Sequence, residues 1–481
     1  MIIKKALNKF KEMSLPMKAS IAFVICSFLQ RGISTLTTPI FTRLLTTEQY
    51  GYYNIFNSWL EIIAVFTTLK LGGSVFQQAL VKFDKQRDEI SASTAGLGTT
   101  ITLLTYCLYL PFRHWINHWL EMDTLIMTCI FVASWATLIF ELWADRQRNE
   151  YRYKPLVALT IITSVAKPLF GIIAILCTKY YKAEARIVSL VIVETLAYSW
   201  LLFLFLRKGK FFNKRFWKYS LALNIPLIPH YLTRMVLNQS DKLMIKYMVG
   251  YSEAGIYGLA HSLAWMLTLI TTAILNTMNP WIFQRIKKKE FGRIGKTSYS
   301  ILVIVMITGM GLIAIAPEIV RLFAPKDYYS AIWVIPPLVI SVYFMFMYSL
   351  FACFEYYYEK SKFLMIASTI GGVLNIVLNY FCIKEFGFVA AGFTTLICYI
   401  FYALVHYLFM KKIIKNELES TQVYNVSIII GISLAFLVAA GIMMITYDLI
   451  IIRYCVIVIS AFVVYSQRSR IINIVKEIKN K

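Results

Sequence analysis

The sequence predicts an all-α membrane protein with about 14 transmembrane helices, arranged as two six-helix lobes and two C-terminal helices. Three observations predict this class: an apolar composition, long apolar runs along the whole chain, and basic residues gathered in alternate connecting segments. Of the 481 residues, 59% are hydrophobic and 15% are charged. Soluble domains are about 45–50% apolar and about 25% charged, so a multi-pass membrane protein is expected.

The apolar runs define the predicted spans, because a helix needs about 20 mostly apolar residues to cross a bilayer. No connecting segment has room for a soluble catalytic domain. The run at 255–283 is long enough to tilt or kink, and the last two runs nearly touch. The predicted spans are 19–41, 52–77, 92–112, 122–143, 155–177, 185–206, 220–240, 255–283, 298–317, 328–352, 362–383, 386–410, 424–445 and 448–466.

Lys and Arg are distributed unequally between the two sides of these spans. With the N-terminus in the cytoplasm, the cytoplasmic segments hold 34 Lys and Arg residues and the outer segments hold 11. This asymmetry predicts that both termini are cytoplasmic. It also explains the net charge of +24 without nucleic acid as a partner.

A short motif, G-x-Y-x4-S, occurs twice at an offset of 204 residues, as Gly51–Ser58 and as Gly255–Ser262. Six predicted spans separate the two copies, an even number, so both copies have the same orientation. This indicates a parallel repeat about an axis along the membrane normal. The predicted organisation is an N-lobe at 1–206, a C-lobe at 207–415, and helices 13 and 14 with a basic cytoplasmic tail at 416–481.

Several charged residues fall inside the predicted spans, where a charge costs at least about 2.5–3.5 kcal/mol. Such residues usually face a cavity or a charged partner. One interpretation is structural pairing, of Arg31 with Glu61 and of Lys167 with Glu194. The residues near the midplane are Arg31, Glu61, Lys167, Glu194 and Arg234, with Lys70 and Glu141 nearer the cytoplasmic side.

The second interpretation is a binding cavity, because bases outnumber acids near the midplane. A low-dielectric cavity with surplus positive charge suits an anion, and Arg matches phosphate through its planar fork. The predicted substrate-binding residues are therefore Arg31, Arg234, Lys70 and Lys167. The carboxylates Glu61, Glu194 and Asp241 are predicted to be charge partners or sites of coupling to H+ or Na+.

Helix breakers accompany these charges. Pro39 and Gly32 lie in the first span, Gly72 and Gly73 follow Lys70, and Pro226 and Pro229 precede Arg234. Proline kinks helices, and transporters build central sites from interrupted helices. We expect these positions to bend or break their spans.

Other sites are not supported by the sequence. GRIGKT at 292–297 lacks the spacing of a phosphate-binding loop, so no ATPase motif is present and an enzyme is not expected. His114 and His118 stand four residues apart near Glu121, but Trp115 and Trp119 favour a membrane-interface role over a metal site. We predict no metal site and no cofactor. The eight cysteines are predicted to be small apolar residues.

Two stretches resemble a known family: PIFTRLLTTEQYGYYNIFNS at 39–58 and SDKLMIKYMVGYSEAGIYGLAHSL at 240–263. They are similar to motifs of the polysaccharide (O-antigen and exopolysaccharide) flippases, often called Wzx, of the multidrug/oligosaccharidyl-lipid/polysaccharide (MOP) exporter superfamily. Thr46 and Thr47 stand where a proline often follows the RLL run. The resemblance covers essentially the whole chain.

The resemblance implies a substrate, an undecaprenyl-pyrophosphate-linked oligosaccharide. The protein would move it from the inner to the outer leaflet of a bacterial plasma membrane by alternating access. Membrane lipid would be a further partner, and contact with polysaccharide polymerase and chain-length machinery is left open. The sugars would need polar and aromatic lining residues, for which the candidates are Gln30, Thr35, Asn57, Asn224, Tyr231 and Asn238.

Three alternatives remain. A lipid II flippase would have a similar fold and a similar charge pattern. A multidrug or cation antiporter of the same superfamily would want an acidic cavity, whereas this midplane is basic. A membrane-embedded polysaccharide polymerase or ligase would typically carry a sizeable outer loop.

Overall fold

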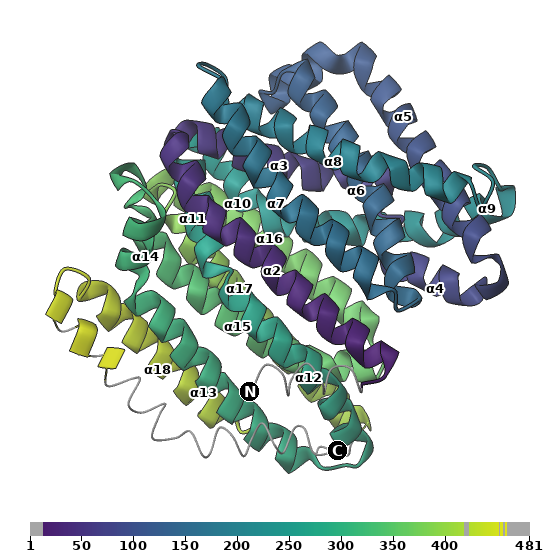
Figure 1. Cartoon of the computed structure of the whole chain (residues 1–481). Helices are drawn as coiled ribbons and strands as arrows, with labels where there is room; N and C mark the ends of the chain where they lie inside the picture. Colours follow the sequence, from purple (N-terminus) through teal and green to yellow (C-terminus); the bar gives the residue numbers. More distant parts are fainter. Residues whose placement is uncertain (1–12, 418–422, 452, 456, 459–481) are drawn as a thin grey trace, which may run out of the picture. The chain divides into compact units, whose positions relative to one another are not determined.

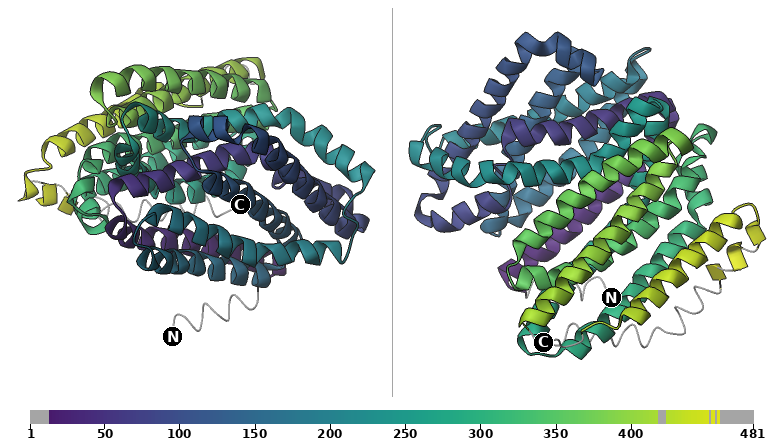
Figure 2. Two further views of the ribbon diagram at one scale, coloured as in Figure 1. Left: turned by 90° about the horizontal axis from the view of Figure 1, so that it is seen from above. Right: turned by 180° about the vertical axis from the view of Figure 1, so that it is seen from behind.

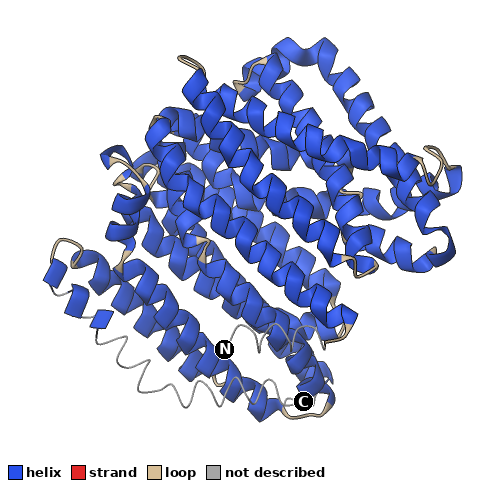
Figure 3. Ribbon diagram, viewed as in Figure 1, coloured by secondary structure: helices blue, strands red, loops and turns tan. Residues whose placement is uncertain are grey.

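The computed structural model describes residues 13–417, 423–451, 453–455, 457 and 458. Within these residues every regular element is a helix, and the connections are short (Figure 3). The chain forms two compact units, Met1–Gln239 and Ser240–Lys481. The predicted basic tail, the N-terminal segment 1–12 and most of the predicted span 448–466 lie outside the described residues.

The first unit begins with the long helix α2, which packs along α7 (Figure 1). Its core forms around α6, whose Leu138, Ile139 and Leu142 are fully buried among residues of α5 and α8. The elements are α2 (Leu15–Leu44), α3 (Thr47–Thr68), α4 (Ser74–Lys82), η1 (Asp84–Gln86), α5 (Arg87–Leu120), α6 (Thr124–Asn149), α7 (Tyr153–Cys177), α8 (Lys182–Leu206), α9 (Lys214–Asn224), η2 (Ile225–Leu227) and α10 (Ile228–Met248), the last of which continues into the second unit.

The second unit is built around α15, which packs against α11, α12, α13 and α17. Figure 2 shows α13, α15, α17 and α18 running side by side. Inside it, His406 Nδ1 lies 2.7 Å from Glu355 Oε1, and both side chains are buried. The elements are α11 (Tyr251–Ala264), α12 (Leu267–Lys287), α13 (Phe291–Ala314), α14 (Ala316–Phe323), η3 (Lys326–Tyr328), α15 (Ala331–Tyr357), α16 (Ser361–Phe386), α17 (Ala390–Glu417) and α18 (Val426–Ile445).

Eleven helical stretches of the described chain are long and apolar enough to cross a membrane. They match eleven of the fourteen predicted spans. The predicted spans 52–77 and 220–240 correspond to α3 and to α9–α10, which are helical but more polar than the eleven. These are the helices that carry Glu61 and Arg234, so their polarity coincides with the charges that the sequence singled out.

The repeated motif occupies the same place in two helices. Gly51 and Gly255 are each the fifth residue of their helix, because α3 begins at Thr47 and α11 at Tyr251. The start of α3 is fixed by a capping box, in which Gln49 N donates to Thr46 Oγ1 and Thr46 N donates to Gln49 Oε1, each at 3.2 Å. A capping box satisfies two backbone donors that the first turn leaves unpaired.

Two of the predicted helix breaks are confirmed. After Thr68, Leu69 and Lys70 both have φ of 47° and Gly73 has φ of 78°, so the chain leaves α3 before α4 begins. Ile225–Leu227 forms a 3-10 turn between α9 and α10, at the predicted prolines. The 255–283 span is also interrupted, between α11 and α12. In contrast, α2 continues through Gly32 and Pro39.

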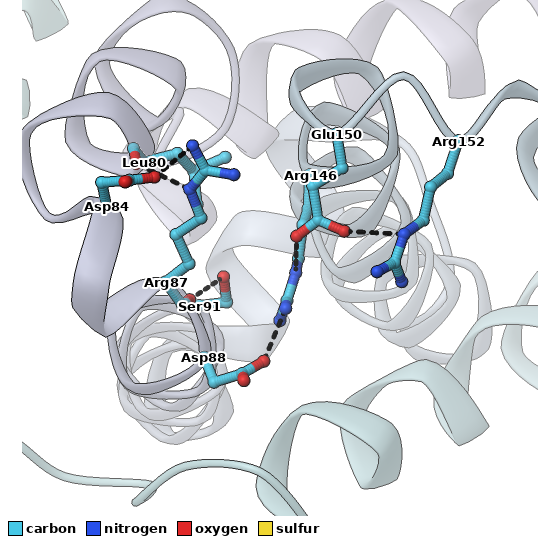
Figure 4. A network of polar contacts seen from close by, with 8 residues as sticks. All are labelled: Leu80, Asp84, Arg87, Asp88, Ser91, Arg146, Glu150 and Arg152. Atoms are coloured by element: carbon cyan, nitrogen blue, oxygen red, sulfur yellow. Dashed lines mark hydrogen bonds and ion pairs between the residues drawn. The ribbon is translucent and has the colours of Figure 1, made fainter.

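An ion-pair network ties α5 to the end of α6 (Figure 4). Arg146 contacts Asp88 Oδ1 through Nη2 at 2.5 Å and Glu150 Oε1 through Nε at 2.9 Å. Arg152 contacts the second oxygen of Glu150 at 3.0 Å. Because the Arg146 side chain is only 12% exposed, its pairs are less screened than surface ion pairs. The network holds these helix ends together.

Gly96 of α5 lets the segment after α8 pack closely against it. A Cβ atom at position 96 would lie 2.2 Å from the backbone oxygen of Phe211. Trp217 Nε1 donates to Ser93 O at 2.9 Å one turn earlier on α5. The close approach depends on the missing side chain, since backbone atoms cannot rotate out of the way.

We expect Gly96→Ala to lower the thermal unfolding midpoint of the purified protein. Overpacking of this kind costs about 1–3 kcal/mol. The control is Gly32→Ala, because a Cβ there meets nothing within 4 Å and alanine favours the helix. Unfolding followed by tryptophan fluorescence in detergent measures both. Equal midpoints for the two variants would contradict the close packing at Gly96.

Candidate functional site

A polar cavity of about 290 Å³ opens among α2, α3, α7 and α8 of the first unit. All four helices are mostly apolar, so a polar interior in this place is unusual for a membrane-spanning bundle. Its described lining combines hydroxyl, amide, aromatic and charged side chains. The lining residues are Gln30, Ser34, Thr37, Phe41, Tyr53, Asn57, Leu60, Ser164, Lys167, Pro168, Arg186, Leu190 and Glu194.

Lys167 and Glu194 form an ion pair across this cavity. The pairing follows from the hairpin, because Lys167 lies ten residues before the end of α7 and Glu194 twelve residues after the start of α8. At about 1.5 Å per residue the two side chains reach similar depth. Glu194 is 7% exposed. The structural pairing of these two residues is therefore correct, while their role toward a ligand stays a prediction.

Arg186 is the second cation of the cavity and was not among the predicted site residues. Its guanidinium lies 3.6 Å from the ring centre of Phe41 and 3.5 Å from that of Tyr53. The residue is 9% exposed. Arg186 stands near the start of α8, at the second position of the predicted span 185–206 and away from the midplane charges that the sequence singled out. Its aromatic neighbours come from other helices, so no local pattern signals the contact.

The described lining carries two cations, Lys167 and Arg186, and one carboxylate, Glu194. The formal sum is one positive charge. Electrostatic interactions are stronger in such a cavity than in water because the surrounding dielectric constant is low. The arrangement can attract an anion, while its hydroxyl and amide groups can form hydrogen bonds with sugar hydroxyls.

A second cavity of the same unit, of about 330 Å³, is lined by Glu61, Lys70 and Glu141 together with apolar and hydroxyl residues. Gln239 Nε2 donates to Glu61 Oε2 at 2.5 Å, and Ser58 Oγ donates to Gln239 Oε1 at 2.9 Å. Two carboxylates and one lysine give this cavity the opposite formal charge. Lys70 therefore lies in an acidic setting rather than beside the other predicted bases.

Arg31 and Arg234 lie on α2 and α10, and both side chains are exposed. Neither lines the cationic cavity, although Gln30 beside Arg31 does. Among the described residues no ion pair joins Arg31 to Glu61, and Glu61 instead accepts the hydrogen bond from Gln239. The predicted structural pairing of Arg31 with Glu61 is thus not found: Arg31 is exposed, and Glu61 is bonded to Gln239 instead.

Asp241 lies in a buried polar network of the second unit. Its carboxylate accepts hydrogen bonds from Tyr257 OH at 2.7 Å, Thr395 Oγ1 at 2.7 Å and Asn379 Nδ2 at 2.6 Å. Asp241 is 6% exposed. Asn375 extends the network, accepting from Ser240 Oγ at 2.8 Å and Asn379 Nδ2 at 3.2 Å. A buried carboxylate among hydroxyl and amide oxygens can hold a proton or a hard cation.

Of the predicted sugar-facing residues, Gln30 and Asn57 line the cationic cavity. Asn224 is buried and donates to Ser220 O at 2.9 Å. Thr35, Tyr231 and Asn238 are not part of its described lining. The sequence thus identified part of the polar lining, on the two helices where an amide interrupts an apolar run.

Family models match two parts of the chain. A model described as polysaccharide biosynthesis protein matches residues 17–287, which is more than half of the sequence. A second model, MatE, matches residues 226–381. The two matches overlap over residues 226–287, which include α10, α11 and α12, and together they span residues 17–381, in both compact units.

Individual relatives agree with this. The chain is 23% identical over 419 residues to the probable low-salt glycan biosynthesis flippase Agl15 of Haloferax volcanii, covering 84% of this chain and 86% of that protein. The fold of this chain is similar to that of the lipid II flippase MurJ in its inward closed conformation. The TM-score is 0.71 and the identity is 15%, over 95% of this chain and all of the other.

A multidrug resistance MATE family transporter of the MOP superfamily, in an inward-facing conformation, has a TM-score of 0.63 and 12% identity, and covers 83% of this chain and all of the other. At these identities the solved structures show the fold, and the family model covers more than half of the sequence. The chain belongs to the polysaccharide biosynthesis protein family, within the multidrug/oligosaccharidyl-lipid/polysaccharide exporter superfamily.

Proposed function

We propose that this protein is a flippase for a lipid-linked oligosaccharide. The substrate is a repeat unit on undecaprenyl pyrophosphate, moved from the inner to the outer leaflet of a bacterial plasma membrane by alternating access. Both chain termini face the cytoplasm in this proposal. The probable flippase Agl15, which is named for glycan biosynthesis, supports the substrate class.

The cationic cavity of the first unit carries the proposal. It offers hydroxyl and amide groups for sugars and positive charge for a pyrophosphate, and four membrane-spanning helices surround it. A multidrug or cation antiporter would want an acidic cavity, whereas the charge of this cavity is positive. The lipid tail has no need of a polar site and remains in the bilayer.

The mechanism has one anion-binding step and one coupling step. The pyrophosphate binds at the bases of the cavity, and Lys167 exchanges Glu194 for the phosphate oxygens. Arg31 and Arg234 contact the pyrophosphate in the state that is open to the cytoplasm. No covalent bond is formed or broken.

Asp241 is the proposed coupling carboxylate. It is more deeply buried than Glu61, which is exposed, and, unlike Glu194, it lies among neutral donors rather than against a base. A proton or a sodium ion would replace hydrogen bonds that Tyr257 and Thr395 now make with it. The coupling ion then binds in the second unit, whereas the substrate binds in the cationic cavity of the first unit.

Wild-type protein is expected to restore surface glycan in a bacterial strain that lacks its own flippase. Lys167→Ala is expected to reduce export about tenfold or more, because a charge-assisted contact is worth about 1.5–3 kcal/mol. Lys179→Ala, in the loop of the same hairpin, is the control. Surface glycan and membrane protein level are measured together.

The double variant Lys167→Ala/Glu194→Gln separates a structural pair from a substrate contact. Lys167→Ala alone leaves the buried carboxylate of Glu194 without its ion-pair partner. The second substitution, Glu194→Gln, removes that unpaired charge. If export returns with the double variant, Lys167 is only the partner of Glu194. If wild-type protein restores no glycan but replaces an essential lipid II flippase, the substrate is lipid II.

Arg31→Ala/Arg234→Ala is expected to reduce export about tenfold or more in the same assay, if each guanidinium contacts phosphate oxygens. The single variants are expected to fall between the double variant and wild type. Arg113→Ala, at the exposed end of α5, is the control. Unchanged export in the double variant would remove both arginines from the mechanism.

Asp241→Asn is expected to reduce the stimulation of transport by an ion gradient. Purified protein in liposomes is supplied with the lipid-linked oligosaccharide, and transport is compared with and without a Na+ gradient and a pH gradient. The variant keeps the hydrogen-bonding shape but loses the charge, so stimulation falls about tenfold or more. Glu61→Gln is the comparison, and loss of stimulation in it alone would move the coupling site to Glu61.

A further inference from the structure

The guanidinium of Arg186 lies against two aromatic rings. Phe41, in the last turn of α2, covers it at 3.6 Å, and Tyr53 of α3 covers it at 3.5 Å. The ring of Tyr50 stands 5.7 Å away. Three helices thus meet at one cationic side chain that is 9% exposed.

This stacking restricts how Arg186 can bind. Rings within about 6 Å of a guanidinium attract it through the negative charge of their faces. A guanidinium is planar, so its N–H groups point outward in its own plane. Rings packed on its faces leave these N–H groups at the edge. A ligand that binds a guanidinium through its N–H groups approaches the edge of this plane, and Arg186 lines the cavity.

A glycine of α7 supports the stack. A Cβ atom at Gly171 would lie 3.4 Å from Phe41 and 3.8 Å from Cγ of Arg186. These are ordinary van der Waals distances, so one methyl group fits and a larger branched side chain would push on the ring. Three elements besides α8 thus hold the position of the guanidinium.

Arg186 and Lys167 differ in position and in freedom. Arg186 lies two turns before Glu194 on α8, or about 12 Å along the helix. Lys167 is bound to Glu194 by an ion pair, whereas the guanidinium of Arg186 is packed against the rings of Phe41 and Tyr53. The cavity consequently has one fixed cation near the α7–α8 turn and one exchangeable cation deeper in the unit.

We propose that Arg186 is the specificity-determining contact of the cavity, a fixed guanidinium that binds a planar or tetrahedral oxyanion of the substrate edge-on. The oxyanion is a phosphate of the pyrophosphate or the carboxylate of an acidic sugar, since each offers a pair of oxygens that can accept two parallel N–H bonds from a guanidinium. This inference rests on the proposed function, because the ligand is taken to be the transported glycolipid.

Arg186→Lys tests the proposal directly, because lysine keeps the charge but loses the planar fork. The control is Arg207→Lys, directly after the last residue of the same helix, since Arg207 lies over the ring of Phe203 at 4.4 Å but is exposed and lies outside the cavity. Binding to purified protein in detergent is measured by calorimetry with inorganic pyrophosphate, glucuronate and neutral maltose as probes.

We expect Arg186→Lys to weaken binding of pyrophosphate or of glucuronate at least about tenfold and to leave maltose unchanged. The probe that responds identifies the oxyanion. Arg207→Lys is expected to change none of the three. If neither anion is bound less well by Arg186→Lys, the proposal is wrong.

A second pair of variants guards against loss of folding. Gly171→Ala is expected to bind the responding probe like wild type, and Gly171→Val to bind it several-fold more weakly with Arg186 still present. Equal binding by both would overturn the role of the stack. Export separates the two proposals: wild-type protein that binds the anion but exports no glycan contradicts the flippase and leaves Arg186 as an anion site.

Discussion

The absence of water in the bilayer core is the constraint on which this structure depends. Every backbone donor and acceptor must be satisfied within its own segment, which leaves helices as the choice for a chain without a barrel. Charged side chains must then meet each other or a cavity. Two interruptions of helix in the described part of the first unit, after Thr68 and at Ile225–Leu227, adjoin α3 and α9–α10, the helices that are not among the eleven apolar spans. Irregular backbone and polar side chains therefore occur together.

The same constraint made the fold readable from the sequence. Apolar runs of the required length recur at regular intervals, and eleven of them are spans in the described chain. The breaks at Gly72–Gly73 and at Pro226 were predictable because glycine and proline act on the local backbone. Gly32 and Pro39 did not break α2, because one glycine costs a helix only about 1 kcal/mol and a proline can kink a long helix without ending it.

The site was less predictable, for a physical reason. Lys167 and Glu194 lie on adjacent spans joined by a short turn, so counting residues from that turn predicts their pairing. The contact of Arg186 with Phe41 and Tyr53 joins α8 to α2 and α3, and the sequence does not reveal how those helices pack. The exposure of Arg31 depends equally on which face of α2 meets α7. Local charge patterns predict depth, whereas partners across helices depend on the packed structure.

The tyrosine of the repeated motif has different roles in the two units. Tyr53 stacks on Arg186 in the first unit, and Tyr257 donates to Asp241 in the second. The tyrosine at the same position of the two motifs thus contacts a cation with the face of its ring in one unit and donates a hydrogen bond to an anion in the other. A duplicated helix that began with this tyrosine could diverge into two sites of opposite charge by changes on its neighbours alone.

The ion pair of Lys167 with Glu194 has a kinetic consequence. A cavity that held an anion only with fixed cations would release it slowly, since its affinity would appear mainly in the dissociation rate. Glu194 competes with any bound anion for the same ammonium group. In the proposed mechanism this internal competitor shortens the dwell time of the anion, and its negative charge takes one unit from the positive charge that attracts the anion.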